Sequence, residues 1–183
     1  MARIGVLALQ GGFAAHGRAL AELGHDVVEV RTPASLASLG GIVLPGGEST
    51  TMLKLLDWTG LAGPLDAFVR SGRPVLATCA GLILAARHVT APPQKSYGWI
   101  DVAVARNAWG RQLDSFEGHA DGSHLPLVFI RAPRITEVGA GVEVLATLNR
   151  EPILVRQGAV TAATFHPELT ADRRVHRAAF LGA

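Results

Sequence analysis

The sequence predicts an α/β fold, namely a single-domain, doubly wound and mostly parallel sheet flanked by helices. In the first half of the chain, short apolar runs alternate with helical patterns, as in consecutive strand–helix units. These runs are nearly continuous stretches of apolar residues rather than alternations of apolar and polar residues, which is typical of strands that helices cover on both faces. In the second half, the runs are joined by short polar or glycine-containing links, which predict antiparallel additions to the sheet.

The elements of the first half follow one another through short connections. Gly24 is a natural stop for the first helix, because glycine accepts the left-handed conformation that often ends a helix. Right-handed crossovers between the strands then build a parallel sheet. The expected strands are Arg3 to Leu9, Asp26 to Arg31, Gly41 to Leu44 and Pro74 to Thr78, and the expected helices are Phe13 to Leu23, Ser49 to Asp57, Leu61 to Arg70 and a segment after Cys79.

The second half is dominated by expected strands, with a short closing helix from about Asp172. No linker, repeat or low-complexity tract interrupts the chain, so we expect residues 1–183 to form one domain. The expected strands here are Ile100 to Ala105, Leu125 to Arg131, Val142 to Leu148, Ile153 to Val155 and Val160 to Phe165.

The composition excludes several classes of protein. Hydrophobic residues make up 49% of the 183 residues and charged residues 17%, which argues against disorder. The net charge is +2 and the arginines are scattered, so we do not expect nucleic-acid binding. No apolar run approaches the ~18 residues that a membrane span needs. The apolar run at the start reads as a strand rather than a signal peptide, because Gln10-Gly11-Gly12 ends it without a cleavage pattern.

A single cysteine, Cys79, occupies the sharpest expected turn in the chain. It excludes an internal disulfide and a zinc site built on paired cysteines, and it fits a reducing, cytoplasmic compartment. A thiol at a strand-to-helix corner lies at a helix N-terminus, where free N–H groups favour the thiolate. Cys79 is therefore a candidate nucleophile, although a buried structural cysteine is the alternative.

Two further segments fall at the same edge of the expected sheet, where ligands bind in open α/β folds. They are Gln10-Gly11-Gly12 and Pro45-Gly46-Gly47-Glu48-Ser49. Paired glycines let backbone N–H groups approach a ligand, as an oxyanion hole requires. Glu48 and Ser49 could equally cap the following helix. A phosphate loop is disfavoured because the P-loop lysine is missing and Glu48 would repel phosphate.

A base for the thiol is expected at His166, in Phe165-His166-Pro167-Glu168. Pro167 favours an extended conformation at His166, and residues two apart in an extended chain face the same side. His166 and Glu168 can then form a Cys–His–Glu relay with Cys79, unless the segment is only a surface turn. Of the other histidines, we expect His16 to decorate a helix, and His25, His88 and His176 to be solvated. A metal at Glu117, His119, Asp121 and His124 is disfavoured, because their spacing is not fixed.

Together these segments resemble the triad-type (class I) glutamine amidotransferases, and more narrowly the glutaminase subunits of pyridoxal 5′-phosphate synthase. Nearly the whole chain takes part, with blocks in the same order and at the same spacing. The blocks are Leu9-Gln10-Gly11, Pro45 to Thr51, Thr78-Cys79-Ala80-Gly81-Leu82-Ile83, Arg106 to Phe116, Phe129-Ile130-Arg131-Ala132-Pro133 and Phe165 to Thr170. One departure is Ala77, where the family usually has glycine two residues before the nucleophile.

The resemblance implies a flavodoxin-like class I amidotransferase fold and the hydrolysis of glutamine to glutamate and ammonia through a glutamyl thioester. It implies that Cys79 is the nucleophile and that His166 and Glu168 complete the triad. It also implies an oxyanion hole formed by the backbone N–H groups of Gly47 and Ala80. The residues implied in glutamine binding are Gly46, Gly47, Glu48, Ser49, Arg106, Ile130 and Arg131.

For Arg106 and Arg131 the implied role is physically sensible, since a guanidinium can hold an α-carboxylate with two hydrogen bonds. Ion pairs at the sheet edge are the alternative. The resemblance further implies that this chain binds no cofactor and no metal. It implies instead that ammonia passes to a barrel-shaped synthase subunit within a large ring-shaped hetero-oligomer.

Two other classes share the architecture. A cysteine peptidase or deglycase-like protein often takes its histidine from just after the elbow, where this chain has Ala80. A non-catalytic docking subunit would not need Cys79, His166 and Glu168 together. Both are disfavoured, and a glutaminase assay with and without the synthase separates them from the amidotransferase.

Overall fold

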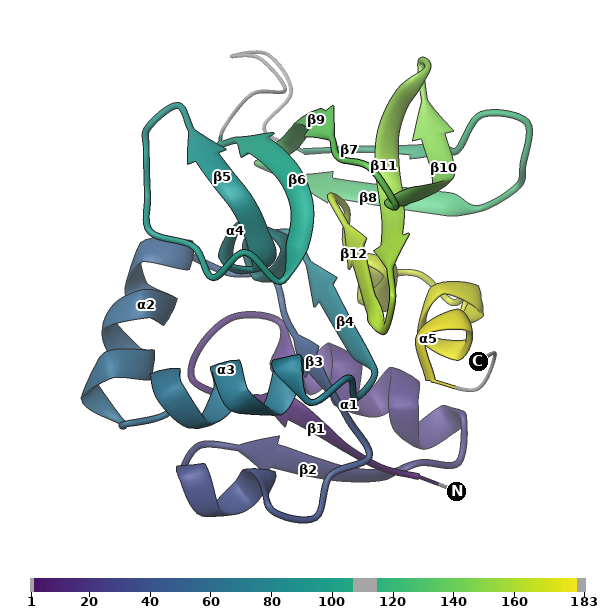
Figure 1. The fold of residues 1–183 in the computed structure, drawn as a ribbon. Helices are drawn as coiled ribbons and strands as arrows, with labels where there is room; N and C mark the ends of the chain where they lie inside the picture. Colours follow the sequence, from purple (N-terminus) through teal and green to yellow (C-terminus); the bar gives the residue numbers. More distant parts are fainter. Residues whose placement is uncertain (1, 107–114, 181–183) are drawn as a thin grey trace.

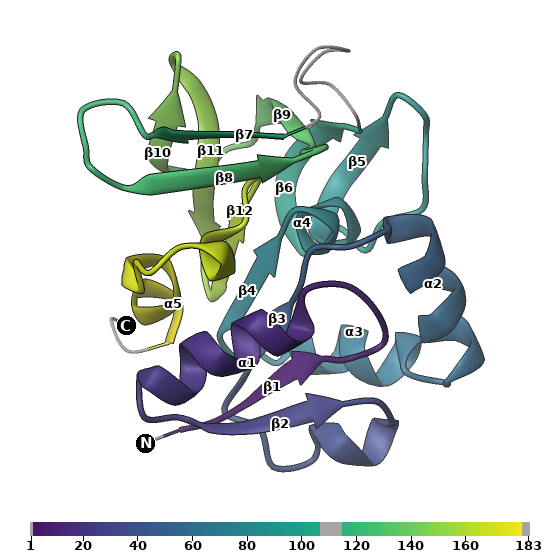
Figure 2. The ribbon, with the colours of Figure 1, turned by 180° about the vertical axis from the view of Figure 1, so that it is seen from behind.

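The structure, a computed structural model, describes residues 2–106 and 115–180 and is shown in Figures 1 and 2. Its strands are β1 (Arg3–Leu7), β2 (Asp26–Val30), β3 (Gly41–Leu44), β4 (Val75–Thr78), β5 (Ala86–Thr90), β6 (Ile100–Ala105), β7 (Ser115–His119), β8 (Pro126–Ile130), β9 (Arg134–Val138), β10 (Glu143–Leu148), β11 (Glu151–Gln157) and β12 (Val160–Ala163). Its α-helices are α1 (Phe13–Glu22), α2 (Ser49–Trp58), α3 (Ala62–Arg70), α4 (Ala80–Ala85) and α5 (Arg174–Phe180), and its short 3-10 helices are η1 (Pro33–Leu36) and η2 (Pro167–Leu169).

The central sheet has seven strands in the order β10-β11-β12-β4-β3-β1-β2. The pairs β12–β4, β4–β3, β3–β1 and β1–β2 are parallel, whereas β11 pairs antiparallel with β10 and β12. The prediction of a mostly parallel sheet with antiparallel additions is therefore confirmed.

Helices cover both faces of this sheet, and alternate residues of one strand enter different cores. On β3, Ile42 and Leu44 pack in the cluster that includes α2, α3 and α4, whereas Val43 packs with α1 and α5. Helices α2 and α3 lie in front of the sheet in Figure 1, and α1 lies in front of it in Figure 2. The apolar strands thus have no solvent face, as their composition predicted. No helix within residues 2–106 and 115–180 is long and apolar enough to cross a membrane.

The predicted strands Ile100 to Ala105 and Leu125 to Arg131 do form, as β6 and β8, but they do not join the central sheet. β6 lies between β5 and β9 in a separate three-stranded sheet, and β8 pairs with β7 alone. The expectation that both extend the central sheet is wrong. Their inward residues, such as Val102 and Phe129, bury against the two existing cores instead.

The carboxyl ends of four parallel neighbours, β12, β4, β3 and β1, lie side by side at one rim of the sheet. The loops that follow these strands contain the segments singled out in the sequence. They contribute Gln10 after β1, Gly46 and Gly47 after β3, Cys79 after β4 and His166 after β12. The topology therefore gathers these segments at one place.

Candidate active site

Cys79 forms the corner between β4 and α4 with a strained backbone. Its φ is 47° and its ψ −104°, in a region that residues other than glycine rarely adopt. The Cys79 N–H donates to the Ala163 carbonyl at 2.9 Å, which fixes the corner to β12. Gly81 allows α4 to pack closely, because a Cβ there would clash with the Leu44 carbonyl. Ala77 lies within β4 opposite Leu44 and Ala162, so its methyl group is accommodated in the buried sheet.

His166 and Glu168 meet as the sequence predicted, but through a different backbone conformation. His166 Nδ1 lies 2.7 Å from Glu168 Oε1, and both side chains are buried. The chain makes a 3-10 turn at Pro167–Leu169 instead of continuing in an extended conformation. The His166 N–H donates to the Val128 carbonyl at 2.8 Å, which ties the imidazole to β8.

The electrostatics of this group favour a charged imidazole. Burial lowers the pKa of His166, but hydrogen bonds to Cys79 and Glu168 outweigh burial and raise it to about 10. Burial raises the pKa of Glu168, yet its hydrogen bond to His166 and nearby His16 hold the pKa below its ordinary value. A protonated imidazole beside a thiol stabilises the thiolate, so the arrangement suits an activated nucleophile.

Position 46 requires a glycine, because any side chain there would collide with His166 and crowd Cys79. A Cβ at Gly46 would lie 2.9 Å from His166 Nδ1 and 3.3 Å from Cys79 Cβ. The Gly46 carbonyl accepts a hydrogen bond from Gly12 N at 3.0 Å. Since C=O and N–H point in opposite directions across a trans peptide bond, the N–H of Gly47 points away from Gly12.

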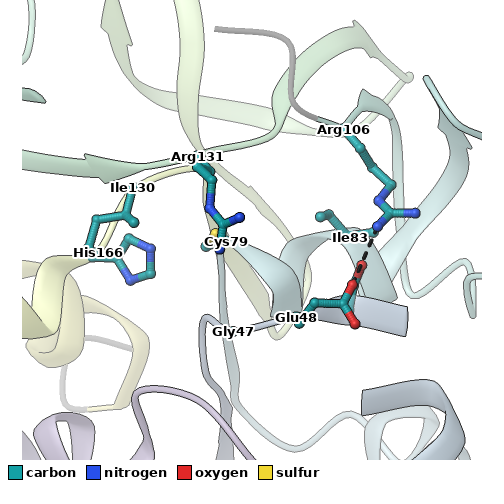
Figure 3. A pocket seen from close by; sticks show the side chains of 9 residues that line it. Gly47, Glu48, Cys79, Ile83, Arg106, Ile130, Arg131 and His166 are labelled. Carbon is teal, nitrogen blue, oxygen red and sulfur yellow. Dashed lines mark hydrogen bonds and ion pairs between the residues drawn. The ribbon is translucent and has the colours of Figure 1, made fainter. Parts of the chain in front are cut away.

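A cavity of about 330 Å³ opens over Cys79 (Figure 3). In that view the His166 imidazole and the Arg106–Glu48 pair lie on opposite sides, with Cys79 between them. Gly46, Ala80 and Glu168 lie outside the cavity lining, and Ala80 is fully buried as the first residue of α4. The lining contains Gly47, Glu48, Ser49, Cys79, Ile83, Arg106, Ile130, Arg131 and His166.

Glu48 caps α2, which was one of the two roles that the sequence left open, and it also lines the cavity. Its carboxylate accepts from Thr50 N at 3.1 Å and from Thr51 N at 2.7 Å. Burial raises the pKa of Glu48, but the hydrogen bonds from Thr51 and Thr50 outweigh it and lower the pKa to about 2. Arg106 Nη2 approaches Glu48 Oε1 at 3.5 Å, so the ion-pair interpretation of Arg106 also holds.

Sequence reasoning missed two residues around the cavity, Ile83 and Gln94, whereas it placed Gln10 at this edge of the sheet. Ile83 lies one helical turn beyond Cys79, and the helical period alone could have indicated it. Gln94 Oε1 accepts from Ser49 Oγ at 2.9 Å, and Gln10 Nε2 donates to the Glu48 carbonyl at 3.0 Å. No sequence signal links Gln94 to Ser49, because their contact depends on how the loop after β5 folds back.

Three expectations about histidines are wrong. His16, His25 and His176 are buried rather than exposed, while His88 is exposed as expected. The helices α1 and α5 turn His16 and His176 toward the sheet rim, where His16 meets Glu168 and His176 meets His16. Residues Asn107 to Asp114, part of the block behind the narrower resemblance, lie outside the described residues.

The chain matches a model of the SNO glutamine amidotransferase family over residues 6–181. A relative from Koribacter versatilis named pyridoxal 5′-phosphate synthase subunit PdxT is 54% identical over 178 residues, covering 95% of this chain and 92% of the relative. A relative of the same name from Deinococcus radiodurans is 52% identical over 188 residues, covering 98% and 95%.

Solved structures agree with the sequence relatives. A crystal structure of a glutamine amidotransferase matches with a TM-score of 0.88 and 46% identity, covering 95% of each chain. The structure of PurLQS from Thermotoga maritima matches with a TM-score of 0.66 at 15% identity, covering 96% of this chain and 92% of that chain, and shows the fold alone. From the family match and these relatives, we conclude that the chain belongs to the SNO glutamine amidotransferase family.

Proposed function

We propose that this chain hydrolyses L-glutamine to L-glutamate and ammonia, as the glutaminase subunit of pyridoxal 5′-phosphate synthase. The observation that carries the proposal is a buried thiol at a strained corner, which lines an open cavity together with His166 of the His166–Glu168 pair. The names of the relatives, which are identical to this chain at about half of the aligned positions, support the substrate class and the pathway.

The Cys79 thiolate attacks the side-chain amide carbon of glutamine and forms a tetrahedral intermediate. The backbone N–H groups of Gly47 and Ala80 stabilise its oxyanion, and the loss of one such donor would raise the barrier by about 3–4 kcal/mol. When the C–N bond breaks, His166 protonates the departing ammonia, and a glutamyl thioester remains. His166 then takes a proton from water, the resulting hydroxide attacks the thioester carbonyl, and glutamate leaves as the thiolate re-forms.

The remaining cavity residues bind the amino-acid end of the substrate. Arg106 and Arg131 offer guanidinium groups to the α-carboxylate, and the Glu48 carboxylate suits the ammonium group. Ser49 Oγ, held by Gln94, and the Gly46, Gly47 and Ile130 backbones complete the contacts. The low pKa of Glu48 supports this assignment, since its carboxylate stays charged at neutral pH.

Ammonia is consumed by a synthase subunit, to which this chain binds as the glutaminase partner. The barrel shape of that partner, its large ring-shaped assembly with this chain and a cytoplasmic location extend the proposal from the family resemblance. In the same proposal, residues 1–183 act as one amidotransferase domain, an idea supported by the two cores that share a single central sheet.

The proposal is tested by glutamate release from glutamine, measured with and without the purified synthase subunit of the same organism. We expect release that increases when the synthase is added and that falls at least about 10³-fold in Cys79→Ala. A docking subunit would bind the synthase without releasing glutamate. A peptidase or deglycase-like protein would act on peptides or glycated thiols and leave glutamine intact. Either result would reject the glutaminase.

A further inference from the structure

Two buried histidines lie directly behind Glu168, and the mechanism above gives neither a part. His16 on α1 and His176 on α5 are both fully buried. His16 Nδ1 lies 2.9 Å from His176 Nε2. On the other edge of its ring, His16 Nε2 lies 3.2 Å from Glu168 Oε2 and 3.1 Å from Thr78 Oγ1. A row of polar groups therefore runs from α5 to the carboxylate that holds His166.

The second carboxylate oxygen of Glu168, Oε2, depends on this row of polar groups for electrostatic stabilisation. Oε1 is hydrogen-bonded to His166 Nδ1, whereas Oε2 is buried and has no hydrogen-bond partner among the described residues. His16 Nε2 is the nitrogen within ion-pair distance of it. A bare lone pair on His16 Nε2 would face a buried carboxylate oxygen at 3.2 Å and repel it, whereas a proton there attracts it.

The proton on His16 Nε2 fixes the rest of the row. A neutral imidazole has one donor and one acceptor, so His16 Nδ1 must then accept. The donor to it is His176 Nε2–H, and this leaves His176 Nδ1 without a proton. That atom is buried and has no partner among the described residues, as expected of the terminal acceptor of the row. In the reverse order, His176 Nδ1 would be a buried donor without an acceptor, which costs more free energy.

We propose that His16 is a positioning residue for glutamine hydrolysis. As a neutral Nε2–H tautomer set by His176, it turns its donor edge toward Glu168 Oε2 and keeps the carboxylate ionised and aimed at His166. The inference rests on the proposed function for its role in turnover, but the positions of the protons can be measured without turnover.

The charged groups around the two histidines are consistent with neutral rings. His16 faces Glu168, His166 and His176, and His176 is also influenced by the charge of Arg173, which is paired with Glu22 at 2.7 Å. Burial lowers the pKa of His16 to about 4 despite the attraction of Glu168. Burial, with a smaller contribution from His16, lowers the pKa of His176 to about 3.

A matched pair of substitutions separates positioning from packing. In His16→Gln the side-chain NH₂ reaches the place of Nε2 and can still donate to Glu168. In His16→Asn the shorter amide reaches only the place of Nδ1, so it can accept from His176 but leaves Glu168 Oε2 without a donor. Both variants leave a polar side chain of similar size in the same place.

The first readout is the rate of Cys79 alkylation by iodoacetamide as a function of pH, followed by mass spectrometry. In His16→Asn, Glu168 takes up a proton at higher pH, so the acid limb of the rate profile should move up by about one pH unit, or about tenfold in rate at any pH below the midpoint of the limb. His16→Gln should restore the wild-type limb. Equal shifts in both variants, or no shift in His16→Asn, would overturn the proposal.

The second readout needs no variant. Two-bond ¹H–¹⁵N correlation spectra of the wild-type protein report which ring nitrogen carries the proton, and we expect the Nε2–H tautomer for both His16 and His176 at pH 7. A proton on His16 Nδ1 would refute the inference even if the chain is a glutaminase. If the tautomers and alkylation profiles are as expected but the chain releases no glutamate, the proposed function is refuted. The proton arrangement then still holds.

Discussion

Cys79 combines two features that a buried structural cysteine does not need. Its backbone is held at a positive φ, which costs on the order of 1–3 kcal/mol, and its side chain shares the cavity with His166, an imidazole whose pKa is raised. The surrounding structure enforces this conformation through the Ala163 carbonyl and the close packing at Gly81. The corner thus places the Cys79 side chain at the cavity at the expense of local stability.

Gly46 gives the sharpest test at the scale of one residue. Gly46→Ala places a methyl group against His166 and Cys79, so we expect kcat/KM for glutamine to fall about 10²-fold and the free energy of unfolding to fall by about 1–3 kcal/mol. Gly63→Ala is the control, because a Cβ there meets nothing within 4 Å on α3. It should raise stability by up to ~1 kcal/mol and leave kcat/KM unchanged. A fully active Gly46→Ala variant would contradict the described contact.

The residues of the site were largely predictable, but their supports were not. Cys79, His166 and Glu48 stand out in the sequence because glycines, a proline and an expected strand end surround them. His16 was expected to decorate a helix and His176 to be solvated, and each lies in a helix that contains other charged residues. Their burial depends on contacts between α1, α5 and η2, which no local pattern contains.

At the scale of elements, the residue that caps α2 also lines the cavity, so stability and the proposed substrate binding depend on the same side chain. Glu48 holds the first amides of α2 with the same carboxylate that faces the cavity. A helix N-terminus stabilises negative charge, so the cap and the binding role favour the same ionised state. The capping role depends on the carboxylate oxygen atoms and predicts a change in stability when they are lost. The proposed binding role depends on the negative charge and predicts a change in KM when the charge is lost.

Glu48→Ala removes the cap and should lower the free energy of unfolding by about 1 kcal/mol in urea denaturation. Glu48→Gln keeps one acceptor oxygen for the amides of Thr50 and Thr51, so most of that stability should remain. Both variants lose the negative charge, and KM for glutamine should rise in both. An unchanged KM in Glu48→Gln would leave Glu48 with only its capping role.

The sequence predicts the helices and central strands to within a few residues, because their apolar runs are long and bounded by glycine or proline. It does not predict β5, β7 and β9. Strand β5 follows α4 without a break, and β7 alternates exposed and half-buried residues in a polar segment. The separate sheets form because their apolar residues fill the two cores, a tertiary effect that periodicity does not encode.

At the scale of the whole molecule, the buried histidines make stability dependent on pH. The folded-state pKa values of His16 and His176, about 4 and about 3, lie below the ordinary value of 6.5. The unfolded chain therefore binds more protons below pH 6.5, and stability is lost as the pH falls. The raised pKa of His166 acts in the opposite direction, since its contribution is complete below pH 6.5 and is lost as the pH rises toward 10.

We expect the free energy of unfolding to decrease by roughly 1.4 kcal/mol for each histidine and each pH unit below 6.5, or ~2 kcal/mol per histidine at pH 5. In His176→Asn this loss should be smaller by ~2 kcal/mol. His88→Asn, at an exposed position, should retain the wild-type slope. Chemical denaturation at pH 7 and pH 5 measures all three proteins, and equal slopes would show that His176 is not buried as a neutral group.

The position of β12 between β4 and β11 has a consequence for biosynthesis. The strand that precedes His166 is made long after the one that precedes Cys79, so a chain emerging from the ribosome carries its thiol before the His166 imidazole is present. Until β12 is added, the hydrogen-bonding edge of β4 is also unpaired. Ammonia production therefore begins only when the insertion of β12 completes the sheet.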